Sequence, residues 1–220
     1  PLVQDAIITI ERNEFLKSEN LDKNKKLVGI FPGSRAVEIE KNFPVLIKAA
    51  IILLKQKSDI QFITPVASTL SEDFIQKFIF RSGINITTTR CNIYNVINAC
   101  DAIAAVSGTV TLQITLMQTP MLIVYKISPI TYRIFKKIVN FTYAGISNVI
   151  AEKEIFREFI QDEATPKNIA CELEKLLYDL NYINDMKKQM GIIKEKLGEK
   201  NGSAAAAQLG RVHPRGRRGG

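Results

Sequence analysis

The fold of this chain is decided by the stretch Leu27-Val28-Gly29-Ile30-Phe31-Pro32-Gly33-Ser34-Arg35. Its first five residues form an apolar run typical of a buried strand, and the last four form a short turn before a helix-like segment. A second turn of the same kind, Ser107-Gly108-Thr109, follows the apolar run Ala102–Val106. In a parallel α/β sheet, such turns lie side by side at the carboxyl ends of the strands. The sequence therefore predicts two neighbouring helix N-termini at one end of a sheet.

These two turns have the chemistry of an anion site. Backbone N–H groups and the positive dipole end of a helix attract phosphate, and the Arg35 guanidinium offers a planar fork of donors. The residues expected to bind through backbone N–H and hydroxyl groups are Gly33, Ser34, Ser107, Gly108 and Thr109. Capping of the two helices is the structural alternative for the hydroxyl residues, and Glu38 is expected to pair with Arg35 or to favour the helix dipole. Two turns with one arginine predict a diphosphate, and hence a nucleotide or a nucleotide sugar.

Strand and helix patterns alternate along most of the chain. Strands are expected over residues 27–31, 60–64, 84–88, 102–106 and 121–125, and helices over residues 38–57, 71–82, 92–99 and 109–117. Five β-rich runs separated by helices predict an α/β fold, a Rossmann-like parallel sheet with helices on both faces. Further helices are expected over residues 128–140, 154–160, 166–178 and 183–197.

The length of 220 residues suits one α/β domain with appendages. Residues 1–26 are polar and irregular and are expected to form a linker, and residues 27–165 form the predicted nucleotide-sugar-binding domain. The C-terminal helices are expected over residues 166–197, and residues 198–220, rich in Ala, Gly and Arg, are expected to be a disordered tail.

Composition removes several classes of function. His213, in the tail, is the only histidine, which argues against a His-based triad or a His-ligated zinc site. The three cysteines Cys91, Cys100 and Cys171 form no CxxC pair, so free thiols in a reducing cytosol are expected. No run reaches the ~18 apolar residues of a membrane span. The formal net charge of +8 fits a solvated surface, an anionic ligand or an anionic membrane.

Several ordered blocks of the chain resemble a known family. Residues 31–35 together with Glu38-Ile39 are similar to the PGSR…E(I/V) signature of the lipid-A-disaccharide synthases. The similarity continues through residues 100–102, 107–112, 119–121, 125–132, 147–151, 158–162 and 164–166. One such block would be weak, whereas ordered blocks across residues 28–170 are specific to this family.

The resemblance implies an inverting hexosyltransferase of GT-B architecture. Such an enzyme transfers 2,3-diacylglucosamine from its UDP donor to 2,3-diacylglucosamine 1-phosphate, giving lipid A disaccharide and UDP, and needs no metal or other cofactor. This chain is similar to the C-terminal, donor-binding half. The catalytic base is expected in an N-terminal half that precedes the linker, so no catalytic residue is assigned. Activity of this chain alone stays open.

The same resemblance implies the partners and the location. Expected partners are the two lipid substrates, the N-terminal half of the enzyme and an anionic membrane surface, whereas nucleic acid is not expected. The protein is expected in the cytoplasm, peripheral at the inner face of the cytoplasmic membrane, with contact through residues 130–141. Formation of a homo-oligomer and the acyl chains accepted stay open.

Four more residues join the substrate-binding set through the resemblance: Gln113, Asn148, Glu158 and Gln161. Gln113 stands where the family usually has a Glu that accepts the ribose hydroxyls; it keeps one carbonyl acceptor and loses the charge. Asn148, Glu158 and Gln161 are expected at the donor sugar or in the cleft between the halves. Lys126 stands where Arg is common. Gln113 and the unusual tail keep open a degenerate nucleotide-binding fragment without catalysis. Another UDP-sugar enzyme such as an epimerase is a second alternative, against which the family block at residues 128–132 argues.

Overall fold

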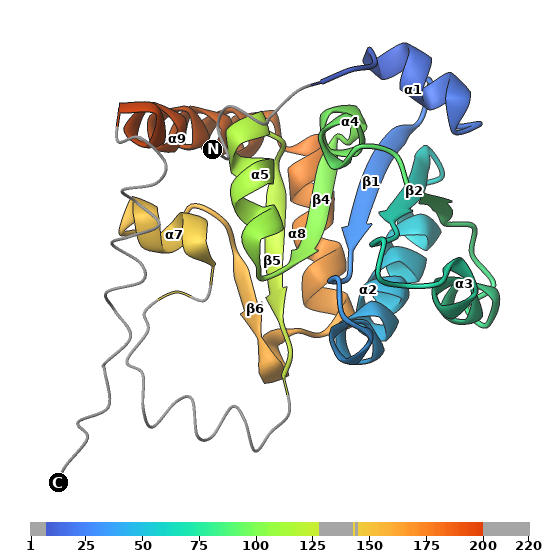
Figure 1. Cartoon of the computed structure of the whole chain (residues 1–220). Helices are drawn as coiled ribbons and strands as arrows, with labels where there is room; N and C mark the ends of the chain where they lie inside the picture. Colours follow the sequence, from blue (N-terminus) through green and yellow to red (C-terminus); the bar gives the residue numbers. More distant parts are fainter. Residues whose placement is uncertain (1–7, 128–142, 144, 200–220) are drawn as a thin grey trace, which may run out of the picture.

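The computed structural model describes residues 8–127, 143 and 145–199. At its centre is a six-stranded sheet whose neighbouring strands all pair in parallel (Figure 1). The strands are β1 (Lys26–Phe31), β2 (Ile60–Pro65), β3 (Thr87–Thr89), β4 (Ala102–Val106), β5 (Met121–Tyr125) and β6 (Glu158–Ile160). The helices are α1 (Arg12–Ser18), α2 (Ala36–Gln56), α3 (Glu72–Phe80), α4 (Ile93–Ala99), α5 (Thr109–Met117), α7 (Ile146–Ala151), α8 (Pro166–Tyr178), α9 (Leu180–Glu199) and a 3-10 turn, η1 (Gln161–Glu163).

The strand order is β3-β2-β1-β4-β5-β6. The chain builds outward from β1 to β3, returns to the centre, and then builds outward from β4 to β6. Strands β1 and β4 are therefore neighbours, with Phe31 opposite Ala105. The direction of strand order reverses between them, and this is where Rossmann-like sheets bind their ligands.

Helices cover both faces of the sheet, which confirms the predicted fold class. Helices α2 and α8 pack against each other on one face, and α8 also contacts β4 and β5. Helices α4, α5 and α7 cover the other face (Figure 1). Because apolar helices lie on both sides, all five residues of β4 are buried, as expected of a central parallel strand. Helix α9 contacts α5, α7 and α8.

Residues 154–160 depart most from the predicted elements. The expected helix there is wrong: α7 lies earlier, at Ile146–Ala151, and Glu158–Ile160 forms β6, with Ile123 opposite Glu158. The apolar residues 155, 156, 159 and 160 fit one face of a helix about as well as they fit a strand. Pairing with β5 decides in favour of the strand, because it satisfies backbone groups that a local pattern cannot place.

The segment before β1 is more ordered than the predicted irregular stretch. It contains α1, whose Phe15 and Leu16 are 0% and 2% exposed. Arg12 donates to the Ala99 carbonyl and pairs with Asp101 at 2.8 Å. A seven-residue helix is not stable by itself, so these contacts to the body of the domain hold it in place.

Two predicted segments lie largely outside the described residues. They are the helix over residues 128–140 and the tail over residues 198–220, of which the structure describes only the end of α9. The predicted strand over residues 84–88 is shorter and later, at Thr87–Thr89. Among the helices of the described ranges, none is both long and apolar enough to cross a membrane.

Candidate functional site

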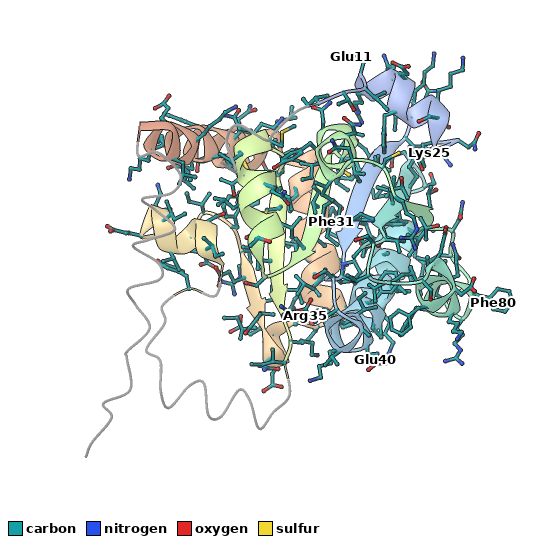
Figure 2. The ribbon with its side chains drawn as sticks, in the orientation of Figure 1. Glu11, Lys25, Phe31, Arg35, Glu40 and Phe80 are labelled. Atoms are coloured by element: carbon teal, nitrogen blue, oxygen red, sulfur yellow. The ribbon has the colours of Figure 1, made fainter. Side chains whose placement is uncertain are left out.

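The two predicted turns lie side by side at the carboxyl end of the sheet. One connects β1 to α2 and the other connects β4 to α5, and β1 and β4 are hydrogen-bonded neighbours. Strands β5 and β6 continue the row, so that Lys126 and Gln161 follow adjacent strands at the same end. Figure 2 shows Arg35 beyond the end of β1, at the same end of the sheet as Glu40 on α2. The residues that follow β1, β4, β5 and β6 therefore form one row.

The turn after β1 is folded around the carboxylate of Glu38. Glu38 Oε2 accepts hydrogen bonds from the backbone N–H groups of Ser34, at 3.1 Å, and Arg35, at 3.4 Å. Gly33 has φ +110°, and a Cβ on it would lie 2.7 Å from Glu38 Oε2, so only glycine fits this turn. The predicted Arg35–Glu38 pair is confirmed, with Arg35 Nη1 3.1 Å from Glu38 Oε1. The Arg35 side chain is 81% exposed and can still reach a ligand.

The turn after β4 offers fewer donors than the sequence predicts. The Ser107 N–H donates to the Val124 carbonyl at 3.0 Å and so extends the pairing of β4 with β5. This N–H is therefore engaged within the sheet, and contact of Ser107 with phosphate stays a prediction. Thr111 N–H and Thr111 Oγ1 both bond to the Gly108 carbonyl, at 3.2 and 2.7 Å, and these bonds close the first turn of α5. The N–H groups of Gly108 and Thr109 belong to the end of the helix, where donors are directed outward.

Gln113 lies one helical turn beyond Thr109, as predicted. Its Nε2 donates to the Tyr94 hydroxyl on α4 at 3.2 Å. This bond uses the amide nitrogen, so the amide oxygen is the acceptor that a ribose hydroxyl would need. Gln113 is half-buried, in agreement with a residue at the wall of a site.

Asn42 connects the first turn of α2 to the end of β5, and the sequence analysis did not single it out. Its amide nitrogen donates to the Glu38 carbonyl at 2.8 Å and to the Lys126 carbonyl at 3.3 Å, and its oxygen accepts the Lys126 N–H at 3.1 Å. Asn42 is 1% exposed. In the sequence, Asn42 could have been recognised as a polar residue directly beside the apolar face of α2. Lys126 Nζ lies 3.5 Å from the Ala164 carbonyl.

Gln161 carries two features of a ligand-binding residue. Its backbone has φ +50°, a strained conformation for a residue other than glycine. Its Nε2 atom is buried and has no hydrogen-bond partner among the described residues. Such donors are rare in proteins, because leaving one unpaired costs about 1–3 kcal/mol. Gln161 thus follows β6 at the carboxyl end of the sheet, and its contact with the ligand stays a prediction.

Asn148 and Glu158 lie in a buried network rather than at a surface. Asn148 Nδ2 donates to the Phe156 carbonyl at 2.8 Å and to Glu158 Oε1 at 2.7 Å. Its Oδ1 accepts the N–H groups of Ile155 and Phe156, at 2.8 and 3.0 Å. Glu158 Oε1 also accepts the Gly145 N–H at 2.9 Å. Asn148 has used both donors and both lone pairs within the chain, which gives it a structural role, and its place at the donor sugar or in the cleft between the halves stays a prediction.

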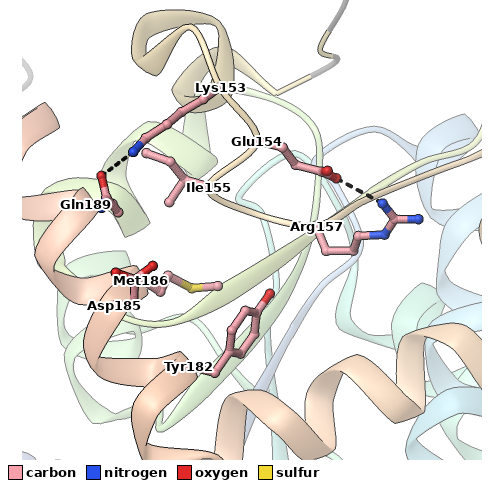
Figure 3. Close-up of a pocket in the computed structure, with 8 residues that line it drawn as sticks. All are labelled: Lys153, Glu154, Ile155, Arg157, Tyr182, Asp185, Met186 and Gln189. Carbon is pink, nitrogen blue, oxygen red and sulfur yellow. Dashed lines mark hydrogen bonds and ion pairs between the residues drawn. The ribbon is translucent and has the colours of Figure 1, made fainter.

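A separate pocket lies between the segment that precedes β6 and helix α9 (Figure 3). Its volume is about 200 Å³, and Lys153, Glu154, Arg157 and Gln189 are among its lining residues. Lys153 bonds to Gln189, and Glu154 pairs with Arg157 at 3.3 Å. The lining charges are thus largely paired with each other, and the pocket is not at the carboxyl end of the sheet.

Burial raises two pKa values, one at the end of β5 and one just before β4, at the opposite end of the sheet. Burial, and then the nearby negative charge of Glu38, raise the pKa of Tyr125 at the end of β5. The negative charge of Glu38 therefore acts on Tyr125, at the end of β5. Burial raises the pKa of the Cys100 thiol, which keeps it protonated. In the described ranges, no group of three His, Cys, Asp or Glu side chains is placed to hold a metal ion.

Known proteins similar in sequence to this chain belong to one family of transferases. A family model described as lipid-A-disaccharide synthetase matches residues 1–209. The lipid-A-disaccharide synthase of Geobacter sulfurreducens is 42% identical over 198 residues, which cover 90% of this chain and 52% of that protein. The chain spans about half the length of the curated relatives it matches.

Solved structures of low sequence identity share the fold. The C-terminal domain of a group 1 glycosyl transferase (LpcC) from Francisella tularensis has a TM-score of 0.61 at 16% identity, covering 88% of this chain and 96% of that domain. Anabaena Alr3699/HepE in complex with UDP and glucose has a TM-score of 0.57 at 15% identity, covering 91% of this chain and 54% of that protein.

Proposed function

Because the chain belongs to the lipid-A-disaccharide synthase family, we propose that it is the donor-binding half of such an enzyme. The complete enzyme would transfer 2,3-diacylglucosamine from UDP to 2,3-diacylglucosamine 1-phosphate. The observation that carries the proposal is the meeting of two helix N-termini and Arg35 at the reversal of strand order. A diphosphate is the group that such an arrangement suits.

The reaction would use these residues to stabilise the leaving group. The 6-hydroxyl of the acceptor would attack the anomeric carbon of the donor, the bond from that carbon to UDP would break, and the hydroxyl proton would pass to a base in the other half. Negative charge grows on the diphosphate as its bond breaks. Donors that are already oriented, such as the Gly108 and Thr109 N–H groups and the Arg35 guanidinium, favour that charge, and losing one typically costs about 10²-fold in rate.

The remaining site residues fit the nucleoside and the sugar. Gln113 would accept a ribose hydroxyl through its amide oxygen while Tyr94 holds its nitrogen. Gln161 would donate its buried Nε2 to a hydroxyl of the donor sugar, which would satisfy an otherwise unpaired donor. The binding of UDP and glucose by Anabaena HepE on the same fold supports a nucleotide sugar as the ligand class. The match to the transferase family favours transfer over the epimerase alternative.

Calorimetric titration with UDP tests the donor site. We expect saturable binding of UDP, with ADP binding more weakly, and a loss of about 10- to 100-fold in UDP affinity for Arg35→Ala, because a charge-assisted contact is lost. Arg81→Ala removes another exposed arginine, at the end of α3, and serves as the matched control. Equal affinity of Arg35→Ala and the wild type for UDP would refute the assignment of Arg35.

The location is part of the same proposal. We propose that the protein works at the cytoplasmic face of the membrane, because both proposed substrates are acylated sugars. The segment expected to make this contact, residues 130–141, lies outside the described residues. Co-sedimentation with anionic vesicles should weaken as salt rises, and equal binding to neutral vesicles at high salt would contradict it.

A further inference from the structure

Three donors that face the proposed diphosphate site converge on one internal carboxylate. Glu38 Oε2 takes the N–H groups of Ser34 and Arg35, and Glu38 Oε1 takes Arg35 Nη1. A glutamate at the third helical position commonly reaches back to the N-cap N–H. Here the same side chain also takes the N–H of the preceding residue and the only guanidinium of the turn. This carboxylate therefore sits where an anionic ligand would be bound.

Gly33 and Asn42 allow the Glu38 carboxylate to reach the turn after β1. Gly33 lies so close to Glu38 that any Cβ would collide with it, at 2.7 Å from Oε2 and 2.9 Å from Glu38 Cβ. The Asn42 amide nitrogen donates to the Glu38 backbone carbonyl at 2.8 Å, and Asn42 itself is 1% exposed. The Glu38 side chain is one-third exposed.

We propose that Glu38 is an internal competitor of the diphosphate: its carboxylate holds the turn in a binding-ready shape and must give up the Ser34, Arg35 N–H and guanidinium donors when the donor substrate binds. This inference rests on the proposed function of the site. Binding is then an exchange of one anion for another. A diphosphate carries more charge and more acceptor oxygens than a carboxylate, so it wins the exchange, but with reduced affinity.

The exchange makes a directional prediction that a purely structural cap does not make. Glu38→Gln keeps the length of the side chain and one oxygen that can accept the turn N–H groups, but it removes the negative charge from the site. UDP affinity should then rise about 3- to 10-fold, the range expected for deleting one like charge near a partly exposed phosphate. Affinity for uridine, which has no phosphate, should not change.

The experiment is calorimetric titration of the wild type, Glu38→Gln and Glu40→Gln with UDP, uridine and inorganic pyrophosphate. Glu40 is exposed on the same helix two residues away, so Glu40→Gln controls for the change in net charge. Thermal unfolding of each variant shows whether the turn still folds. Tighter binding of UDP and pyrophosphate by Glu38→Gln alone, with uridine unchanged, supports the competition.

The outcomes separate the inference from the proposed function. If the wild type binds UDP and folded Glu38→Gln binds it equally or more weakly, Glu38 is only a cap and the inference is overturned. If neither protein binds UDP or pyrophosphate, the proposed donor site and the inference both fail. If only Glu38→Gln binds, the internal carboxylate is the dominant competitor, as proposed.

Discussion

Replacing Asn148 with alanine is expected to destabilise the domain strongly, because its side chain closes the buried network between α7 and β6. The variant would remove the side-chain partner of two backbone N–H groups, at residues 155 and 156, and of the Phe156 carbonyl, and it would take one of several partners from Glu158. Each lost bond to a buried group costs about 1–3 kcal/mol, and partial access of water at Ile155 lowers the sum. We expect a loss of about 3–5 kcal/mol in the free energy of unfolding, a large share of the ~5–15 kcal/mol of a typical domain.

Urea unfolding followed by circular dichroism measures this loss. With a slope of about 2–3 kcal/mol per molar urea, the midpoint should fall by roughly 1–2.5 M. Asn181→Ala, at an exposed position of α9, is the matched control and should leave the midpoint unchanged. A midpoint for Asn148→Ala within about 0.3 M of the wild type, at an unchanged slope, would refute the structural role.

Asn148→Asp sharpens the same test. It keeps the acceptor for the two N–H groups but places a second carboxylate against Glu158, where the amide nitrogen now lies 2.7 Å from Oε1. Two carboxylates in contact bind a shared proton more readily than separate ones. The stability of this variant relative to the wild type should therefore increase as the pH falls from 8 to 5, and a constant difference would contradict the contact.

Three further predictions concern the described core. Burial, and then the hydrogen bond to Glu172, raise the pKa of Tyr182. The Tyr182 hydroxyl therefore contributes its full stability below about pH 10, and this contribution is lost at higher pH. Urea midpoints from pH 7 to 11 should fall less steeply for Tyr182→Phe than for the wild type. Iodoacetamide should modify exposed Cys171 in the native state and buried Cys100 only on unfolding, as intact mass with peptide mapping will show, and rapid native modification of Cys100 would contradict its burial. Phe15→Ala should cost about 3–5 kcal/mol in urea unfolding although it lies in the segment predicted as a linker, whereas Phe80→Ala, at an 89% exposed position, should cost little.

Elements with strong local signals were predicted well. The bounds of β4, β5, α5 and α8 agree with the expected ranges, because each is an uninterrupted apolar run or begins at a capping residue. Short elements without a capping signal were predicted poorly, whereas the seven-residue α4, which begins after Asn92, was expected within one residue of its bounds. Helix α1 and strand β6 have seven and three residues, too few for a pattern to separate helix, strand and loop.

Features of the candidate site were likewise predicted where they depend on local sequence and missed where they depend on contacts between elements. Both turns and Arg35 are visible in the sequence, since each is a local event at the end of an apolar run. The burial of Asn148, the use of the Ser107 N–H by Val124 and the role of Asn42 are not visible, since each depends on a partner from another element.

By itself, the sequence determined the alternation of strands and helices, the position of the two turns and the family, because these depend on residue types and their spacing. Only the tertiary structure decided which donors of those turns remain for a ligand. Hydrogen-bonding groups accept a limited number of partners, and the choice between an internal carboxylate, a neighbouring strand and a phosphate is made by distances in the folded chain. For that reason Glu38, whose pairing with Arg35 the sequence already indicated, is the carboxylate that accepts the Ser34 and Arg35 donors in the folded chain.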